Sequence, residues 1–129
     1  MATIYKRFVL DTSADSAWQK VRATQNVHEL FGMLVDARVD GDQRVCRTTD
    51  GGELVERIIT VDDAARRIAY TITDSPFGFE FHSASWQISE HGGETVFEWF
   101  TDVKPDPIAE VLDVVIDGEK NNIIAGLSA

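Results

Sequence analysis

The chain has 129 residues, of which 43% are hydrophobic and 9% aromatic, as expected for one folded domain over residues 1–129 rather than a disordered segment. Its formal net charge of −10 disfavours nucleic acid and anionic membrane surfaces as partners. A single cysteine excludes an intrachain disulfide, which favours a cytoplasmic location. No signal peptide or membrane span is expected, because no apolar run approaches the ~18 residues of a span.

The first third of the chain predicts one strand and two short helices. Residues 4–10 alternate between apolar and polar side chains, which is typical of a strand. Residues 11–13 then offer helix-capping side chains before a helical pattern over residues 14–23. A second short helical segment over residues 27–31 ends at Gly32.

Residues 33–104 predict six consecutive antiparallel strands separated by five turn clusters. The clusters lie at residues 40–42, 50–53, 62–66, 74–78 and 92–93. Asp106 and Pro107 then provide a cap and a first-turn proline for a long helix, with Gly118 as a weak point inside it.

One architecture accommodates this order. A curved antiparallel sheet cannot bury its own concave face, and the C-terminal helix is the only element long enough to fill it. The sequence therefore predicts an α+β helix-grip fold, in which seven strands curve around the long C-terminal helix and two short helices follow the first strand.

The turns predict which side chains face inward, because a hairpin loop sets the pairing and alternation sets the face. A two-residue turn at Gly92-Gly93 places Trp86 opposite Trp99 and His82 opposite Val103. It also pairs Ile88 with Phe97 and Ala84 with Thr101. This face is aromatic and apolar, whereas Phe81 and Phe100 are expected on the outer face.

Two further hairpins place a polar pair on the same concave face. We assume a four-residue loop at 50–53 and a three-residue loop at 63–65. The predicted pairs are Thr49 with Leu54, Arg47 with Glu56, Val45 with Ile58, Thr60 with Ile68, Ile58 with Tyr70 and Glu56 with Ile72. The opposite orientation stays open, because Val55, Ile59 and Val61 make the other face apolar too.

In their order and spacing, these segments resemble the START-like, or SRPBCC, helix-grip superfamily, and within it the polyketide cyclase/dehydrase and lipid transport group. The segments that carry the resemblance are residues 45–48, 52–58, 61–62, 68–70, 92–99 and 103–105. The superfamily includes carriers, hormone receptors and cyclases, so the resemblance implies a ligand cavity without choosing an activity.

The abscisic-acid receptors of that superfamily are similar in an arginine and in a Glu-Arg step before an aspartate turn. By that resemblance Arg47 and Glu56 would be polar groups of the pocket, and loops 50–53 and 75–78 would correspond to its gate and latch. The gate here lacks an apolar residue and the latch lacks a basic one. Receptor function is therefore not carried over.

The sequence gives little support for a metal site, a phosphate-binding loop or covalent catalysis. The three histidines, His28, His82 and His91, lie in a helical segment, a strand and a turn, without ligand spacing. The glycine pairs connect strands and do not open helices, as phosphate loops do. Cys46 lies on an alternating strand, where an activated thiolate is not expected. We predict neither a metal nor a cofactor.

The predicted site is a polar cluster among aromatic walls. The ligand-binding residues are Arg47, Glu56, Tyr70, Ile72, His82, Trp86, Phe97 and Trp99. The leading hypothesis is binding or carrying of a hydrophobic or aromatic small molecule. A cyclase/dehydratase-like enzyme, with His82 or Glu56 as general base, is the alternative. An interaction module using Phe81 and Phe100, for example as a homodimer, is the third.

Overall fold

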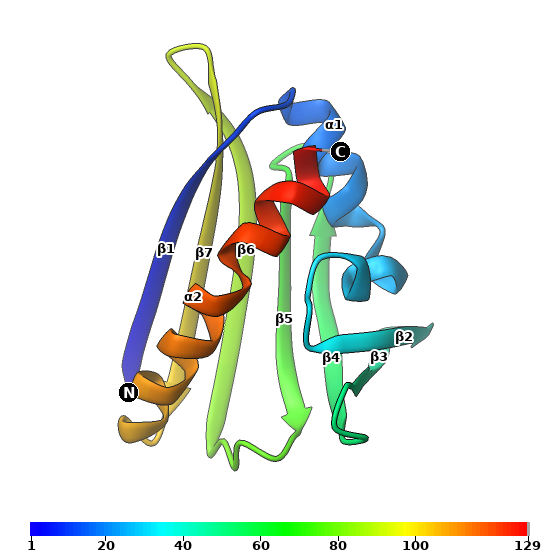
Figure 1. Cartoon of the computed structure of the whole chain (residues 1–129), viewed down its shortest axis with the longest axis vertical. Coiled ribbons are helices and arrows are strands. Elements are labelled where there is room, and N and C mark those ends of the chain that lie inside the picture. Colours follow the sequence, from blue (N-terminus) through cyan, green and yellow to red (C-terminus); the bar gives the residue numbers. More distant parts are fainter. Residues whose placement is uncertain (129) are drawn as a thin grey trace.

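In the computed structural model, which describes residues 1–128, a seven-stranded antiparallel sheet curves around a long C-terminal helix (Figure 1). The strands are β1 (Ala2–Leu10), β2 (Leu34–Asp40), β3 (Gln43–Thr48), β4 (Glu53–Asp62), β5 (Arg67–Asp74), β6 (Phe81–His91) and β7 (Glu94–Lys104). They lie in the order β1-β7-β6-β5-β4-β3-β2. The helices are α1 (Ala14–Arg22), the 3-10 helix η1 (Thr24–Glu29) and α2 (Pro107–Ser128). The predicted helix-grip architecture is confirmed.

Helix α2 crosses the concave face of the sheet and supplies much of its cover (Figure 1). Leu112, Ile116 and Ile123 are buried on its inner side, while Val114 on its outer side is 70% exposed. Lys6 of β1 bridges to two aspartates of the helix, at 2.7 Å and 2.9 Å. The described residues contain no helix with the length and apolarity needed to traverse a lipid bilayer.

The β6–β7 hairpin has the predicted register throughout. Trp86 lies opposite Trp99 and His82 opposite Val103, because Gly92 and Gly93 both adopt positive φ and close a two-residue turn. The two tryptophan rings contact each other at a centroid distance of 5.2 Å. Phe81 and Phe100 are exposed on the other face, as predicted.

The predicted β3–β4 register is wrong. The loop comprises the three residues 49–51, because the Thr48 N–H donates to the Gly52 carbonyl at 2.9 Å. Gly51 takes a left-handed φ of 89°, and Asp50 accepts hydrogen bonds from the Thr48 hydroxyl and the Gly52 N–H. Glu56 therefore lies opposite Arg44, while Arg47 lies opposite Glu53. The pairing is shifted by three residues, an odd number, so every side chain of β3 lies on the face opposite to the predicted one. The pairs Thr49–Leu54 and Val45–Ile58 do not form.

The β4–β5 hairpin contains two departures that cancel. Its loop has four residues rather than three and ends at Arg66, which has a positive φ of 51°. Thr60 consequently pairs with Ala69 instead of Ile68. A bulge between Ile58 and Thr60 then restores the predicted alignment, so that Ile58 faces Tyr70 and Glu56 faces Ile72. The second helix also differs, since it begins at Thr24 and is 3-10.

Two glycines of α2 provide a matched test of how this helix packs. A Cβ at Gly118 would meet nothing within 4 Å, whereas a Cβ at Gly126 would lie 2.7 Å from the Leu30 side chain. We expect Gly118→Ala to stabilise the protein by roughly 1 kcal/mol, because glycine in a helix interior is entropically costly. Gly126→Ala should destabilise it, because overpacking typically costs about 1–3 kcal/mol.

Urea unfolding of the two variants measures both effects on one scale. Equal stabilisation by the two alanines would contradict the close packing of α2 against η1.

Candidate functional site

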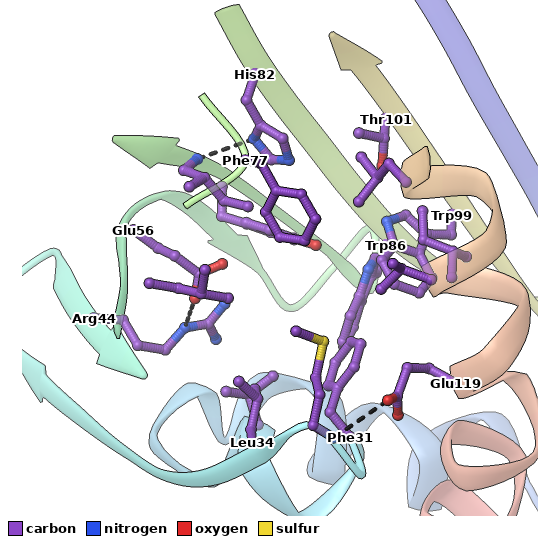
Figure 2. Close-up of a pocket in the computed structure, with 18 residues that line it drawn as sticks. Phe31, Leu34, Arg44, Glu56, Phe77, His82, Trp86, Trp99, Thr101 and Glu119 are labelled. Carbon is purple, nitrogen blue, oxygen red and sulfur yellow. Dashed lines mark hydrogen bonds and ion pairs between the residues drawn. The ribbon is translucent and has the colours of Figure 1, made fainter. Parts of the chain in front are cut away.

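A cavity lies between α2, the η1–β2 connection and the concave face of β3–β7 (Figure 2). The volume of the cavity is about 70 Å³. Six of the eight predicted ligand-binding residues line it, namely Glu56, Tyr70, Ile72, His82, Trp86 and Trp99. Most of the wall is apolar, and the polar groups project into it from several strands.

The other two predicted residues do not line the cavity. Arg47 is on the outer face of β3, where it forms an exposed ion pair with Asp36 at 2.7 Å. Phe97 is fully buried and stacks on Phe8 at 5.5 Å, which makes it part of the core behind the wall. Arg47 was misplaced by the loop length of the β3–β4 hairpin, and Phe97 shares the correct face but lies beyond the cavity.

Arg44 occupies the position predicted for Arg47. Its Nε donates to Glu56 Oε1 at 2.8 Å and its Nη1 donates to the Thr24 carbonyl at 3.1 Å. The residues are only 3% and 6% exposed, so this is a buried ion pair at one end of the cavity (Figure 2). Among residues 1–128, neither Glu56 Oε2 nor Arg44 Nη2 has a hydrogen-bond partner. These two atoms are free to meet a ligand.

Cys46 and Tyr70 flank the ion pair. The Cys46 thiol donates to Glu56 Oε1 at 3.3 Å, and burial, reinforced by the Glu56 charge, raises its pKa to about 12. Such a thiol is not a nucleophile at neutral pH. Burial also raises the pKa of Tyr70, whose ring lies 5.4 Å from the Arg44 guanidinium carbon. Tyr70 therefore offers a neutral hydroxyl to the cavity.

The ring of His82 is held in one orientation by its neighbour in the sheet. Its Nδ1 accepts the Ile72 N–H at 2.9 Å, so in the neutral ring the proton lies on Nε2. Burial lowers the pKa of His82 to about 4. At neutral pH this side chain is therefore a hydrogen-bond donor, and its geometry does not suit the general-base role that the sequence suggested.

Three polar atoms of the β6–β7 wall are buried without hydrogen-bond partners. They are the indole nitrogens of Trp86 and Trp99 and the hydroxyl of Thr101. The Trp86 N–H lies near enough to the Tyr70 hydroxyl to favour its ionisation, although the two lack hydrogen-bond geometry. Unpaired polar groups are costly in a protein interior and mark places where a ligand could supply the partner.

Several lining residues could not be identified from the sequence. Phe31 and Phe77 project from connections outside the regular strands, and Phe31 packs against both tryptophans. Phe77 belongs to the 75–78 loop that the resemblance likened to a latch, whereas residues 50–53 do not line the cavity. Glu119 of α2 accepts the N–H groups of Gly32 and Met33 at 2.7 Å and 3.3 Å. Arg44 had a signal in the Asp50-Gly51 turn of the three-residue loop, and the Gly92-Gly93 turn had already placed Thr101 on this face.

Metal-ligand side chains are not clustered in the part of the chain that the structure describes. No three histidine, cysteine or carboxylate residues of residues 1–128 are arranged to hold a metal ion.

A curved sheet gripping a long helix, with a cavity between them, defines a START-like protein. The chain belongs to the polyketide cyclase/dehydrase and lipid transport family, whose model matches residues 1–123. A comparison with curated protein sequences gives no significant match.

Solved structures with the same fold have low sequence identity to the chain. A Bacillus thuringiensis protein is 15% identical with a TM-score of 0.88, and the match covers 98% of both chains. A START superfamily protein from Mycobacterium smegmatis is 11% identical with a TM-score of 0.76, over 98% of this chain and 94% of that one. Norcoclaurine synthase from Thalictrum flavum, in complex with dopamine and hydroxybenzaldehyde, is 16% identical with a TM-score of 0.73, over 98% and 84%. At these identities the likeness concerns the fold.

The buried pair predicts a strong dependence of stability on each partner. Arg44→Ala or Glu56→Ala should each lower the free energy of unfolding by about 3–5 kcal/mol, because each leaves an uncompensated buried charge. The double variant Arg44→Met/Glu56→Leu should regain much of that loss, since it buries no charge. Arg47→Ala, which removes an exposed pair on the same strand, should cost less than about 1 kcal/mol. Urea denaturation of all four variants distinguishes these cases, and a large effect of Arg47→Ala would contradict the register.

Protonation of His82 predicts a decline of stability in acid. Its pKa in the folded protein, about 4, lies below the ordinary value near 6.5, so the unfolded chain takes up the proton first. The free energy of unfolding should therefore fall by about 3 kcal/mol as the pH drops from roughly 6.5 to 4. Above about pH 6.5 the ring is neutral in both the folded and the unfolded chain, so His82 causes no such loss there. His82→Gln should remove that part of the pH dependence, whereas His91→Gln, at an exposed turn, should leave it. Unfolding free energies measured across this range would refute the assignment if both variants behaved alike.

Proposed function

We propose that the protein binds a compact, mostly apolar small molecule in the cavity under α2. The observation that carries this proposal is a cavity with apolar and aromatic walls and several polar atoms that lack partners. Ligand sites of proteins commonly have this character, because apolar contacts provide most of the affinity and a few polar groups set the orientation. The lipid transport in the family's description agrees with a binding function.

The size of the cavity limits the ligand. Its volume of about 70 Å³ is well below the roughly 300–1,000 Å³ typical of pockets for drug-sized ligands. This suits a molecule built around one aromatic ring, unless Phe31 or Phe77 moves aside to enlarge the space. Both side chains are partly buried at the edge of the core, and neither belongs to a strand.

A cyclase- or dehydratase-like activity is the second hypothesis, and one atom favours it. Glu56 Oε2 is an unpaired carboxylate oxygen in a cavity shielded from bulk water, where it could accept a proton from an enolisable carbon. Tyr70 and His82 would then donate to the developing oxyanion. Turnover of a bound ligand that is lost in Glu56→Gln while binding persists would favour this enzyme, and binding without turnover would favour a carrier.

Neighbouring valines of α2 provide the test of ligand binding. Val115 lines the cavity, whereas Val114 points outward and is 70% exposed. Native mass spectrometry of protein purified from its own host should show a retained small molecule, which Val115→Trp should exclude by filling the space and Val114→Trp should leave in place. Circular dichroism checks that both variants are folded. Equal retention by the two variants, or no retained molecule in any of them, would count against the proposal.

A further inference from the structure

The side chains that line the cavity carry an excess of negative formal charge. Arg44 is the only cationic side chain among the described residues that line it, and its Nε already donates to Glu56 at 2.8 Å. Glu119 supplies a second carboxylate, which accepts two backbone N–H groups and the Asn122 amide. His82 is neutral, since burial lowers its pKa to about 4. The cavity therefore holds one positive and two negative formal charges.

This excess of negative charge disfavours the binding of an anion. An anionic ligand near Arg44 would have to share that cation with Glu56, and the two carboxylates would repel it in a region of low effective dielectric constant. Entry would also strip the anion of water without offering a free counter-charge, which is costly in a buried site. A neutral ligand meets none of these penalties.

The unpaired atoms define what a neutral ligand should offer. The indole N–H groups of Trp86 and Trp99 are buried donors without acceptors, and Nε2–H is the remaining donor of the His82 ring, whose Nδ1 accepts the Ile72 N–H. Glu56 Oε2 is an acceptor without a donor. A ligand with a carbonyl-type oxygen and an adjacent N–H or O–H group could satisfy both kinds of atom at once.

We propose that the cavity selects an uncharged, ring-sized carbonyl compound carrying an N–H or O–H donor, and that Glu56 excludes the carboxylate of the same shape. This inference rests on the proposed binding function and adds a charge rule to it. Glu56 acts by neutralising Arg44, so the residue that makes the site polar also makes it intolerant of anions.

Benzamide and benzoate test the rule directly, because they share size and shape and differ in charge near neutral pH. Titration followed by amide and indole N–H resonances should show benzamide shifting the Trp86 and Trp99 indole signals, with an affinity at least about tenfold higher than that of benzoate. Equal or tighter binding of benzoate by the natural protein would overturn the inference. Shifts confined to surface residues would overturn it as well.

The Glu56→Gln variant should reverse the preference. It leaves Arg44 buried without a counter-charge, so benzoate should bind more tightly than benzamide and should raise the melting temperature of the variant by mass action. Asp36→Asn removes a carboxylate from the exposed pair on the other face of the sheet and should keep the natural preference. In Arg44→Gln/Glu56→Gln, which removes both charges, the stabilisation by benzoate should disappear. Stabilisation by benzoate that persists in this double variant would overturn the role of Arg44.

The titrations also separate this inference from the proposed function. If benzoate binds the natural protein at the tryptophans and Val115→Trp blocks it, the cavity binds ligands but the charge rule is wrong. If neither compound moves the indole resonances and no small molecule is retained in the native spectrum, the binding function and the charge rule both fail.

Discussion

The cover that α2 gives to the concave face is the constraint on which this fold depends. The strands turn a mostly apolar surface toward the helix, including Trp86, Trp99 and the fully buried Phe97 beside them. The helix is fixed at both halves, because Lys6 holds Asp113 and Asp117 while Glu119 accepts the backbone N–H groups of the η1–β2 connection. The carboxylate of Glu119 thus joins the helix to the segment that carries Phe31 and forms one edge of the cavity.

The cavity exists where this cover is incomplete, and its chemistry follows from what the sheet places there. A buried ion pair is weak evidence for stability, because desolvation offsets much of the attraction between its charges. Arg44 and Glu56 each keep one atom without a partner, beside a histidine whose proton position is fixed by Ile72. A buried pair of this kind often adds less to stability than well-packed apolar side chains of similar volume would.

The sequence was sufficient to predict the architecture and six of the residues that line the cavity. Local turn chemistry predicted the β6–β7 hairpin, because two consecutive glycines permit one short turn and alternation then places His82, Trp86 and Trp99. It failed at β3, where the loop is one residue shorter than expected and lies earlier in the chain, so the pairing shifts by three residues and Arg44 takes the place predicted for Arg47. Phe31, Phe77 and Glu119 come from loops and from a helix, and their position depends on packing between elements that no local pattern describes.

The bulge between Ile58 and Thr60 has a consequence for how this fold tolerates change. It absorbs one residue within β4, so the length of the connecting loop ending at Arg66 and the alignment of Glu56 with Ile72 are independent of each other. A change of one residue in that exposed loop can be offset by the gain or loss of such a bulge, which leaves the pairing of Glu56 with Ile72 in place. The inward position of Glu56 is thus insulated from the length of the exposed loop by one unpaired residue, Ile59.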